Sequence, residues 1–201
     1  MDKLILLVGP SGVGKTTIAQ QLEKEGYNII HSYTTRKPRT PNEWGHIFID
    51  KSKLSRTPFT VVYDGDDNIP PFNQKPIAFK ELYGELYFAT QEQYKSKGIS
   101  IYAVDPGGAE RVQQNVKDAE IITIYLTADE SIRYQRICSR ELKKYKEVSI
   151  GKRMIIDIEA DERIQEDKKI FSKCKCDYVV DANRELEQVV TDIKEIIKES
   201  N

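Results

Sequence analysis

The chain has 201 residues, of which 39% are hydrophobic and 31% are charged, so it can form one domain of ordinary size with an apolar core. Lys and Arg number 31 against 32 Asp and Glu, and the net charge of −1 excludes a basic field over the whole protein for nucleic acid. With 11 glycines, 8 prolines and 3 cysteines, the collagen-like, low-complexity and disulfide-scaffold classes are also excluded.

Three features of the chain bear on its surroundings. No apolar run approaches the roughly 20 residues of a membrane-spanning helix, and the N-terminal apolar stretch lacks a signal-peptide cleavage site. The sparse cysteines, Cys138, Cys174 and Cys176, suit a reducing compartment. We therefore expect a cytoplasmic monomer or homodimer with no membrane or nucleic-acid partner. Cys174 and Cys176, placed on one strand, are expected to be surface cysteines and not metal ligands.

The first half of the chain begins with an unbroken apolar run, Leu4 to Val8, which is typical of a strand buried on both faces. A glycine-rich loop and a helix with an apolar face follow it. Polar, proline-containing stretches then alternate with short strands. The expected strands are 4–8, 28–31, 47–49 and 59–63, the expected helix is 15–25, and the expected loops are 9–14, 33–45 and 64–74.

The second half alternates strands and helices more regularly. Thr127 and Glu130 form a capping-box pattern at the start of one helix. The expected strands are 99–104, 121–126 and 178–180, the expected helices are about 108–116, 130–140, 153–171 and 184–198, and 143–152 is an expected charged loop. Such alternation predicts an α/β fold with a parallel sheet covered by helices on both faces.

The loop after the first strand matches the pattern Gly-x-x-x-x-Gly-Lys-Thr from Gly9 to Thr16. Its glycines allow backbone N–H groups to surround a phosphate chain, and the following helix N-terminus favours an anion. Lys15 would lie along the β- and γ-phosphates and Thr16 would hold Mg²⁺. The expected phosphate-site residues are Gly9, Pro10, Ser11, Gly12, Val13, Gly14, Lys15, Thr16 and Thr17. This motif alone leaves GTPases, ATPases and small-molecule kinases open.

A second basic loop, Ser32-Tyr-Thr-Thr-Arg-Lys-Pro-Arg39, follows the second expected strand. Arg36 and Arg39, held beside a proline and several hydroxyls, suit a phosphate dianion because guanidinium groups bind phosphate oxygens at two points. The alternative is an ordinary solvated basic loop. Its position after the first phosphate loop favours a second phosphate site.

These two motifs together resemble those of the guanylate kinase family, and weaker matches follow in the family's order over nearly the whole chain. The weaker matches are Glu43-Trp-Gly45 with Phe48, Gly84-Glu-Leu-Tyr87, Val104-Asp-Pro-Gly-Gly108, Ile132-Arg133 with Arg136, Ser139-Arg140, Ile150-Gly-Lys-Arg-Met154 and Tyr178-Val-Val-Asp-Ala-Asn183. The resemblance implies a P-loop NTPase three-layer fold, a parallel sheet with helices on both faces, an acceptor-binding insert and a mobile lid. The expected single domain has its core at about 1–31, 97–140 and 153–201, the acceptor region at about 32–96 and the lid at about 140–153.

The implied activity is ATP- and Mg²⁺-dependent phosphorylation of a nucleoside monophosphate, with GMP or dGMP expected as the acceptor. The implied catalytic residues are Lys15, Arg36, Arg136 and Arg153. Arg140 and Asn183 join the glycine-rich loop at ATP, Thr16 binds the metal, and the acceptor site comprises Ser32, Arg36, Arg39, Tyr87, Thr90 and Asp105. Arg133 is expected to face solvent, and His31 and His46 are expected to be ordinary loop histidines.

The departures from the family pattern gather on the acceptor side. Ala78 stands where the family has the glutamate that pairs with guanine, and Glu81 or Glu85 would have to supply the carboxylate. The hairpin at Gly45–Phe48 is short and lacks a tyrosine, with His46 as the polar substitute. Two alternatives therefore stay open: a kinase for a different phosphorylated acceptor, and a non-catalytic binding module. Retention of Lys15 and Thr16 favours an enzyme.

Overall fold

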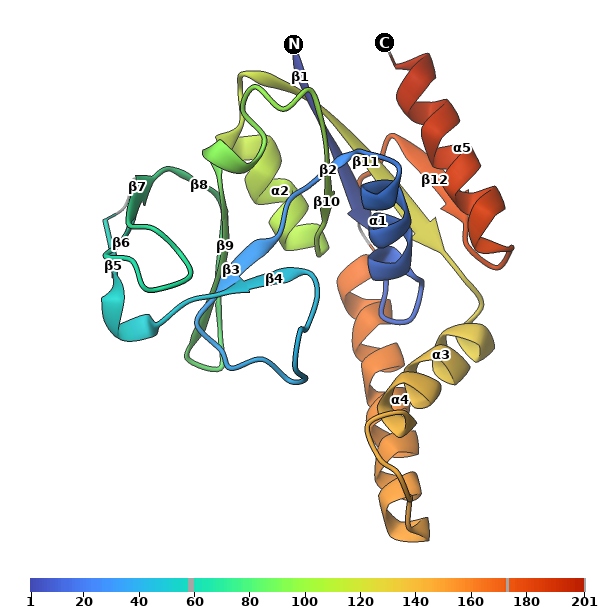
Figure 1. Cartoon of the computed structure of the whole chain (residues 1–201). Helices are drawn as coiled ribbons and strands as arrows, with labels where there is room; N and C mark the ends of the chain where they lie inside the picture. Colours follow the sequence, from blue (N-terminus) through green and yellow to red (C-terminus); the bar gives the residue numbers. More distant parts are fainter. Residues whose placement is uncertain (58–59, 173, 201) are drawn as a thin grey trace. The chain divides into compact units, whose positions relative to one another are not determined.

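The computed structural model describes residues 1–57, 60–172 and 174–200, and Figure 1 shows their ribbon. The chain divides into two compact units. The first comprises Met1–Leu6, Glu25–Tyr102 and Gly107–Ile122, and the second comprises Leu7–Lys24, Ala103–Pro106 and Thr123–Asn201. The glycine-rich loop therefore belongs to the second unit and the basic loop after Ser32 belongs to the first.

A five-stranded sheet has the order β12-β11-β1-β10-β2. Its strands are β12 (Tyr178–Asp181), β11 (Ala119–Thr127), β1 (Asp2–Val8), β10 (Ile99–Ala103) and β2 (Asn28–Ile29). The β10–β2 and β11–β12 pairs are parallel, and residues 4–8 of β1 are completely buried. The predicted α/β class and the buried first strand are confirmed, because only strands covered on both faces carry such a continuous apolar run.

The helices of the second unit pack in two groups. Helix α1 (Lys15–Lys24) buries Ile18, Ala19 and Leu22 and packs against α5 (Leu186–Glu199), which also contacts β12. Helix α3 (Glu130–Leu142) packs along α4 (Ile150–Phe171), as Figure 1 shows. The apolar contact between α3 and α4 consists of Ile137, Cys138, Ile156, Ala160 and Ile164. These positions on α4 repeat every four residues, which places them on one face of the helix.

The first unit contains two further sheets and most of helix α2 (Pro106–Asn115). One sheet has the order β4-β3-β9-β8, with β4 (His46–Phe48), β3 (Ser32–Thr34), β9 (Glu85–Thr90) and β8 (Pro76–Leu82). The other is antiparallel and comprises β5 (Leu54–Arg56), β6 (Val61–Tyr63) and β7 (Phe72–Gln74). Short 3₁₀ turns lie at Lys51–Lys53 and Gln91–Gln93. The buried core of this unit is Ile49, Val61, Tyr63 and Phe88.

The β8–β9 hairpin turns through Tyr83 and Gly84, whose φ angles are 51° and 76°. Leu82 and Glu85 form the last pair before this two-residue turn. Positive φ at both central positions is the mark of a type I′ turn, whose twist matches that of the flanking strands. Gly84 adopts this conformation freely, whereas Tyr83 is an unusual residue for it.

Several predicted loops of the first unit are strands. Tyr33 lies in β3, which pairs in parallel with β4 and antiparallel with β9. The expected turn at 64–74 ends in β7, and the expected strand at 28–31 is limited to Asn28–Ile29. The polar, basic sequence around β3 conceals a strand because its partner β9 lies far along the chain. Phe59, the first residue of one expected strand, lies outside the described residues.

Helix boundaries in the second half also differ from the predictions. The N-cap of α3 is Asp129, not Thr127, so the capping-box interpretation is wrong. Helix α2 begins at Pro106, which suits a first turn because that position needs no N–H donor. Helix α4 begins at Ile150, because the Ser149 side chain accepts a hydrogen bond from the Lys152 N–H. The connection between α3 and α4 therefore runs from 143 to 149.

Candidate active site

The glycine-rich loop joins β1 to α1 in a conformation that requires its glycines. The φ angle is 78° at Gly12 and 108° at Gly14, values that side chains other than glycine rarely adopt. A Cβ atom on Gly12 would lie 2.6 Å from the carbonyl oxygen of Arg133, so the loop lies directly against α3. A Cβ on Gly9 would lie 2.7 Å from the carbonyl of Leu126 in β11. Backbone of neighbouring elements therefore fixes the loop on two sides.

Cationic side chains hold the carbonyl oxygens of this loop. The Lys15 ammonium donates hydrogen bonds to the carbonyls of Gly9 and Pro10. Arg133 Nε donates to the Ser11 carbonyl at 2.9 Å, and Arg136 Nη1 lies 3.2 Å from the Val13 carbonyl and 3.5 Å from that of Gly12. Carbonyl groups held in this way fix the orientation of the loop peptide groups, which is the kind of geometry that lets backbone N–H groups face an anion.

Lys15 itself is only weakly basic in this setting. Burial lowers the pKa of its ammonium to about 8, against the opposing effect of the carboxylates of Asp167 and Asp105. Thr16 and Thr17 are exposed in the first turn of α1. The positive end of the helix dipole, an ammonium and a hydroxyl therefore meet at one place, which favours an anion.

A buried ion pair lies behind the loop. Asp167 Oδ2 accepts from the Ser11 N–H at 2.7 Å and from Arg133 Nη2 at 2.6 Å. Arg133 is 5% exposed and Asp167 is 8% exposed. The predicted solvent-facing position of Arg133 is wrong, because Arg133 lies four residues before Ile137 and so shares the buried face of α3. Asp167 was missed, although a carboxylate in line with the buried Ala160 and Ile164 is the signal that marks it.

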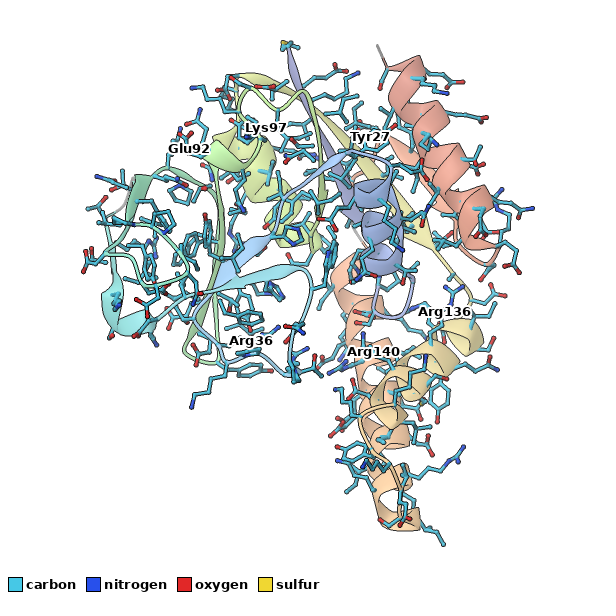
Figure 2. All side chains as sticks on the ribbon, in the orientation of Figure 1. Tyr27, Arg36, Glu92, Lys97, Arg136 and Arg140 are labelled. Carbon is cyan, nitrogen blue, oxygen red and sulfur yellow. The ribbon has the colours of Figure 1, made fainter. Side chains whose placement is uncertain are left out.

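The other predicted donor-site residues of the second unit have varied surroundings, and Figure 2 labels two of them on α3. Arg136 also donates to the carbonyl of Ala182 at 3.1 Å. Arg140 is mostly exposed, with Glu141 Oε1 3.5 Å from its guanidinium. Arg153 is exposed on the first turn of α4. The Arg136 guanidinium therefore contacts backbone carbonyls of the glycine-rich loop. The charges of Arg140 and Arg153 face solvent.

Asn183 was predicted at the ATP site and Asp105 at the acceptor site. The Asn183 carboxamide accepts from the Asp129 N–H at 2.8 Å and donates to its carboxylate, so it fixes the start of α3. Asp105 lies in the second unit between β10 and α2 and raises the pKa of Lys15 electrostatically. Its predicted companions in the acceptor site, by contrast, belong to the first unit.

In the first unit, one carboxylate organises the basic loop. Glu43 accepts two hydrogen bonds from the Arg36 guanidinium, at 2.9 and 2.5 Å, and one from the Arg39 N–H at 2.7 Å. These donors lower the pKa of Glu43 to about 2. The sequence motifs pointed to the two arginines as site residues but not to Glu43, although a single acid seven residues after Arg36 is the signal that marks it.

Aromatic and imidazole rings surround Arg36, which Figure 2 labels. Its Cζ lies 5.2 Å from the centre of the Phe48 ring, and the His46 and Tyr87 rings are 5.9 Å apart. His46 lies on strand β4 and is half-buried, so its interpretation as a loop histidine is wrong. Burial and the nearby Arg36 lower the pKa of His46. Within the described part of the chain, Arg36 Nε and His46 Nδ1 are buried with no hydrogen-bond partner.

Two other predicted acceptor residues, Ser32 and Thr90, are less accessible to a ligand because one is hydrogen-bonded and the other is buried. The Ser32 hydroxyl is 2.9 Å from the hydroxyl of Tyr102. Thr90 is completely buried, and its hydroxyl oxygen has no hydrogen-bond partner among residues 1–57, 60–172 and 174–200. Next to the basic loop, the edge of the Trp44 ring meets His31, with the ring centres 4.9 Å apart.

The position aligned with the family's guanine-binding glutamate is part of the core. Ala78 is 6% exposed and pairs with the buried Ala89 across the β8–β9 ladder. Of the two substitutes considered, Glu81 is exposed on β8. Glu85 Oε2 accepts from the Thr35 hydroxyl at 2.6 Å, and the same hydroxyl accepts from the Leu86 N–H. Of these two candidates, Glu85 is therefore the one whose carboxylate is hydrogen-bonded to the basic loop, through Thr35.

The described residues lack the features of two other kinds of site. They contain no group of three or more His, Cys, Asp or Glu side chains arranged to hold a metal ion. None of the helices formed by these residues is long and apolar enough to cross a membrane. Among the described residues, Cys138, Cys174 and Cys176 form no disulfide, and the latter two precede β12, so their predicted place on a strand is wrong.

Comparison with known proteins relates this site to a family. The model of a family described as "AAA domain" matches residues 5–165. A guanylate kinase of Halalkalibacterium halodurans is 31% identical over 201 residues, which cover 96% of this chain and 86% of that protein. The chain belongs to the guanylate kinase family. Guanylate kinases of Myxococcus xanthus and Homo sapiens are each 27% identical and cover 96% and 97% of this chain, and 85% and 92% of their own lengths.

The fold agrees with that assignment. A crystal structure of guanylate kinase from Anaplasma phagocytophilum superimposes with a TM-score of 0.58 at 13% identity, covering 99% of this chain and 86% of that one. The predicted family and P-loop kinase fold are confirmed. The chain is a phosphotransferase enzyme of the P-loop class, a nucleoside monophosphate kinase by family.

Proposed function

We propose that the enzyme transfers the γ-phosphoryl group of ATP to GMP or dGMP in the presence of Mg²⁺. The observation that carries this proposal is the glycine-rich loop whose carbonyls are held by Lys15, Arg133 and Arg136. The relatives named guanylate kinase support the choice of acceptor. The proposed partners are accordingly small nucleotides.

On the donor side, phosphoryl transfer asks the protein mainly for positioning and for neutralisation of charge. The loop from Gly9 to Thr17 would hold the phosphates through its N–H groups, and Lys15 would move from its own loop carbonyls to the phosphate oxygens. The exposed Thr16, next to Lys15 whose ammonium is affected by the charge of Asp105, would hold a hydrated Mg²⁺, and the ion would supply positive charge that offsets the charge of the phosphates.

On the acceptor side, Arg36 would bind the phosphate of the monophosphate. Glu43 accepts from both terminal nitrogens of its guanidinium, which orients the side chain, and the buried Nε–H has no hydrogen-bond partner among the described residues. A phosphate oxygen at this point would satisfy that group, and the cost of leaving it unpaired would disappear. Arg39, Tyr87, Ser32 and Thr90 complete the proposed acceptor residues.

Base recognition would depend on Glu85, since Ala78 is buried and carries no carboxylate. A carboxylate can accept from both the ring N–H and the amino group of guanine, whereas adenine lacks this pair of donors. We expect Glu85→Gln to lower the GMP-over-AMP ratio of kcat/KM by roughly 10-fold or more. An unchanged ratio would remove Glu85 from the base site.

The arginines of α3 and α4 would supply charge to the transferring group. Arg136 lies at the loop, while Arg140 and Arg153 flank the 143–149 connection and are exposed. In the proposed cycle this connection acts as a lid, which brings Arg140 and Arg153 to the phosphates and excludes water from the transfer.

The deciding experiment is a coupled ADP-release assay with ATP, Mg²⁺ and, separately, GMP, dGMP, AMP, CMP, UMP and dTMP. GMP or dGMP should give the highest kcat/KM, with measurable turnover of other nucleotides. A pyrimidine monophosphate that is turned over faster than GMP would replace the acceptor but keep the kinase. No turnover above the ATPase background with any acceptor would contradict the proposed function.

A further inference from the structure

One residue of the glycine-rich loop, Ser11, is held through both polar atoms of its backbone. Its N–H donates to Asp167 at 2.7 Å, its carbonyl accepts from Arg133 at 2.9 Å, and the two side chains pair with each other at 2.6 Å. We propose that Arg133 and Asp167 are positioning residues that hold the loop in its nucleotide-binding conformation before nucleotide arrives. The inference rests on the proposed function only in that the ligand of the loop is a nucleotide.

The three hydrogen bonds form a closed triangle, which fixes an orientation and not merely a contact. A peptide group held at one atom can still rotate, whereas Ser11 is held at its N–H and its carbonyl by two groups that also hold each other. Arg133 comes from α3 and Asp167 from α4, so the two helices together define where Ser11 lies.

The next loop residue is fixed by the same part of α3. The carbonyl oxygen of Arg133 lies 2.6 Å from the point where Gly12 would carry a Cβ, and Gly12 has a φ of 78°. Arg133 therefore places two consecutive loop residues, one through its side chain and one through its backbone. Preorganisation of this kind lowers the cost of ordering the loop on binding.

Stability alone is a weak reason for this ion pair. Two charges that are 5% and 8% exposed pay a large desolvation cost, and apolar side chains of similar volume often replace such pairs without loss of stability. What apolar side chains cannot do is hold the N–H and carbonyl of Ser11. A test can therefore separate positioning from stability.

The charges of the pair also matter for an anionic ligand. Asp167 lies close enough to raise the pKa of Lys15, so its carboxylate acts on the region where phosphates would bind. Arg133 neutralises it. Removal of Arg133 would leave an uncompensated carboxylate that repels phosphate, whereas Asp167→Asn removes the negative charge but keeps an oxygen that can accept from the Ser11 N–H and from Arg133. Arg133→Met is thus expected to be the more damaging change.

The experiment measures ADP binding by calorimetry for the full chain, with KM values for ATP and for the acceptor as a second readout. Arg133→Met should weaken ADP binding roughly 10- to 100-fold and Asp167→Asn less, while the acceptor KM stays within about twofold. The double variant Arg133→Met/Asp167→Leu should melt at or above the wild-type temperature and still bind ADP about 10-fold more weakly.

A matched control is the exposed pair between Glu130 and Lys168, which joins the same two helices at 2.9 Å and includes the neighbour of Asp167. Glu130→Gln/Lys168→Met should leave ADP affinity unchanged. Wild-type ADP affinity in the apolar double variant, or equal losses for ADP and acceptor, would overturn the inference. A wild-type protein that binds no ADP would overturn the proposed function and the inference with it, and is thereby distinguished from a failure of the inference alone.

Discussion

The basic residues of the site differ mainly in the carboxylates that accompany them. Arg36 is oriented by Glu43, Arg133 is buried with Asp167, and Arg140 remains mostly in solvent. An arginine held by one carboxylate keeps its charge but has a fixed direction, whereas an exposed one can move to meet a ligand. The carboxylate partner and the exposure of the side chain therefore distinguish the arginines that are fixed in place from those that can move.

Lys15→Ala should abolish phosphoryl transfer with little effect on folding. The ammonium donates hydrogen bonds to two carbonyls of its own loop, and in the proposed cycle it neutralises phosphate charge. Loss of one such electrostatic contact costs about 10²-fold or more in kcat. The check is steady-state kinetics together with a thermal melt, and a well-folded Lys15→Ala protein with unchanged kcat would contradict the assigned role.

Arg36→Ala should raise the KM of the monophosphate far more than that of ATP. The guanidinium is the oriented cation of the acceptor loop, and a charge-assisted hydrogen bond is worth roughly 1.5–3 kcal/mol. Arg36→Lys is the informative comparison, since it keeps the charge but cannot form the two-point contact with Glu43. Equal increases in both KM values would place Arg36 outside the acceptor site.

The Arg36–Glu43 pair predicts a pH dependence of stability. The pKa of Glu43 is lowered from 4.5 to about 2 in the folded protein, so this contribution is fully present above about pH 4.5 and is lost as the pH falls toward 2. Glu43→Gln removes the titrating group. Its melting temperature should therefore fall less steeply than that of the wild type between pH 5 and pH 2, as measured by circular dichroism, and parallel curves would contradict the assignment.

At the scale of elements, local pattern and distant pairing explain which predictions hold. The strand β1 and helix α1 are visible in the sequence because their apolar residues follow the period of the element itself. The strand β3 is polar and basic, and it exists because β9 and β4 supply its hydrogen bonds. Such pairing is not encoded in the segment alone, so β3 escaped prediction. Strands β8 and β9 were missed although they form a local hairpin with each other.

The core between the two sheets of the first unit should depend strongly on Phe88. It is 1% exposed and its ring centre lies 5.1 Å from that of Tyr33 and 6.1 Å from that of Phe79. Phe88→Ala is expected to cost about 3–5 kcal/mol in the free energy of unfolding, because a cavity remains. Urea denaturation of the wild type and of Phe88→Ala measures this difference in the free energy of unfolding. Tyr83→Asn in the exposed turn is the contrasting variant, with no loss expected because asparagine suits positive φ.

At the scale of the whole molecule, a continuous motif is easier to predict from the sequence than a contact between distant segments. The phosphate loop is one continuous motif between a strand and a helix, so its residues are neighbours in the chain. Arg133 and Asp167 are 34 residues apart and meet only when α3 and α4 pack. The same reasoning applies to Glu85 and Thr35, which come from separate elements of the first unit. Contacts between distant segments carry no local pattern.

Binding of both substrates should change two segments that belong to different units. A dinucleoside pentaphosphate, which mimics donor and acceptor together, is expected to protect the loop around Trp44 and the 143–149 connection from hydrogen exchange at the same time. ADP alone should protect mainly the loop from Gly9 to Thr16. Protection confined to that loop with the bisubstrate mimic would argue against closure by the predicted lid.

The contact of Trp44 with His31 has an optical consequence. The chain contains a single tryptophan, and its indole and the His31 imidazole form a T-shaped pair beside the basic loop. All tryptophan emission therefore originates from one loop of the first unit, and an ordering of that loop by GMP would alter its intensity without any label. Stopped-flow traces of this emission, recorded with GMP and ATP added in either order, would resolve which substrate the enzyme binds first.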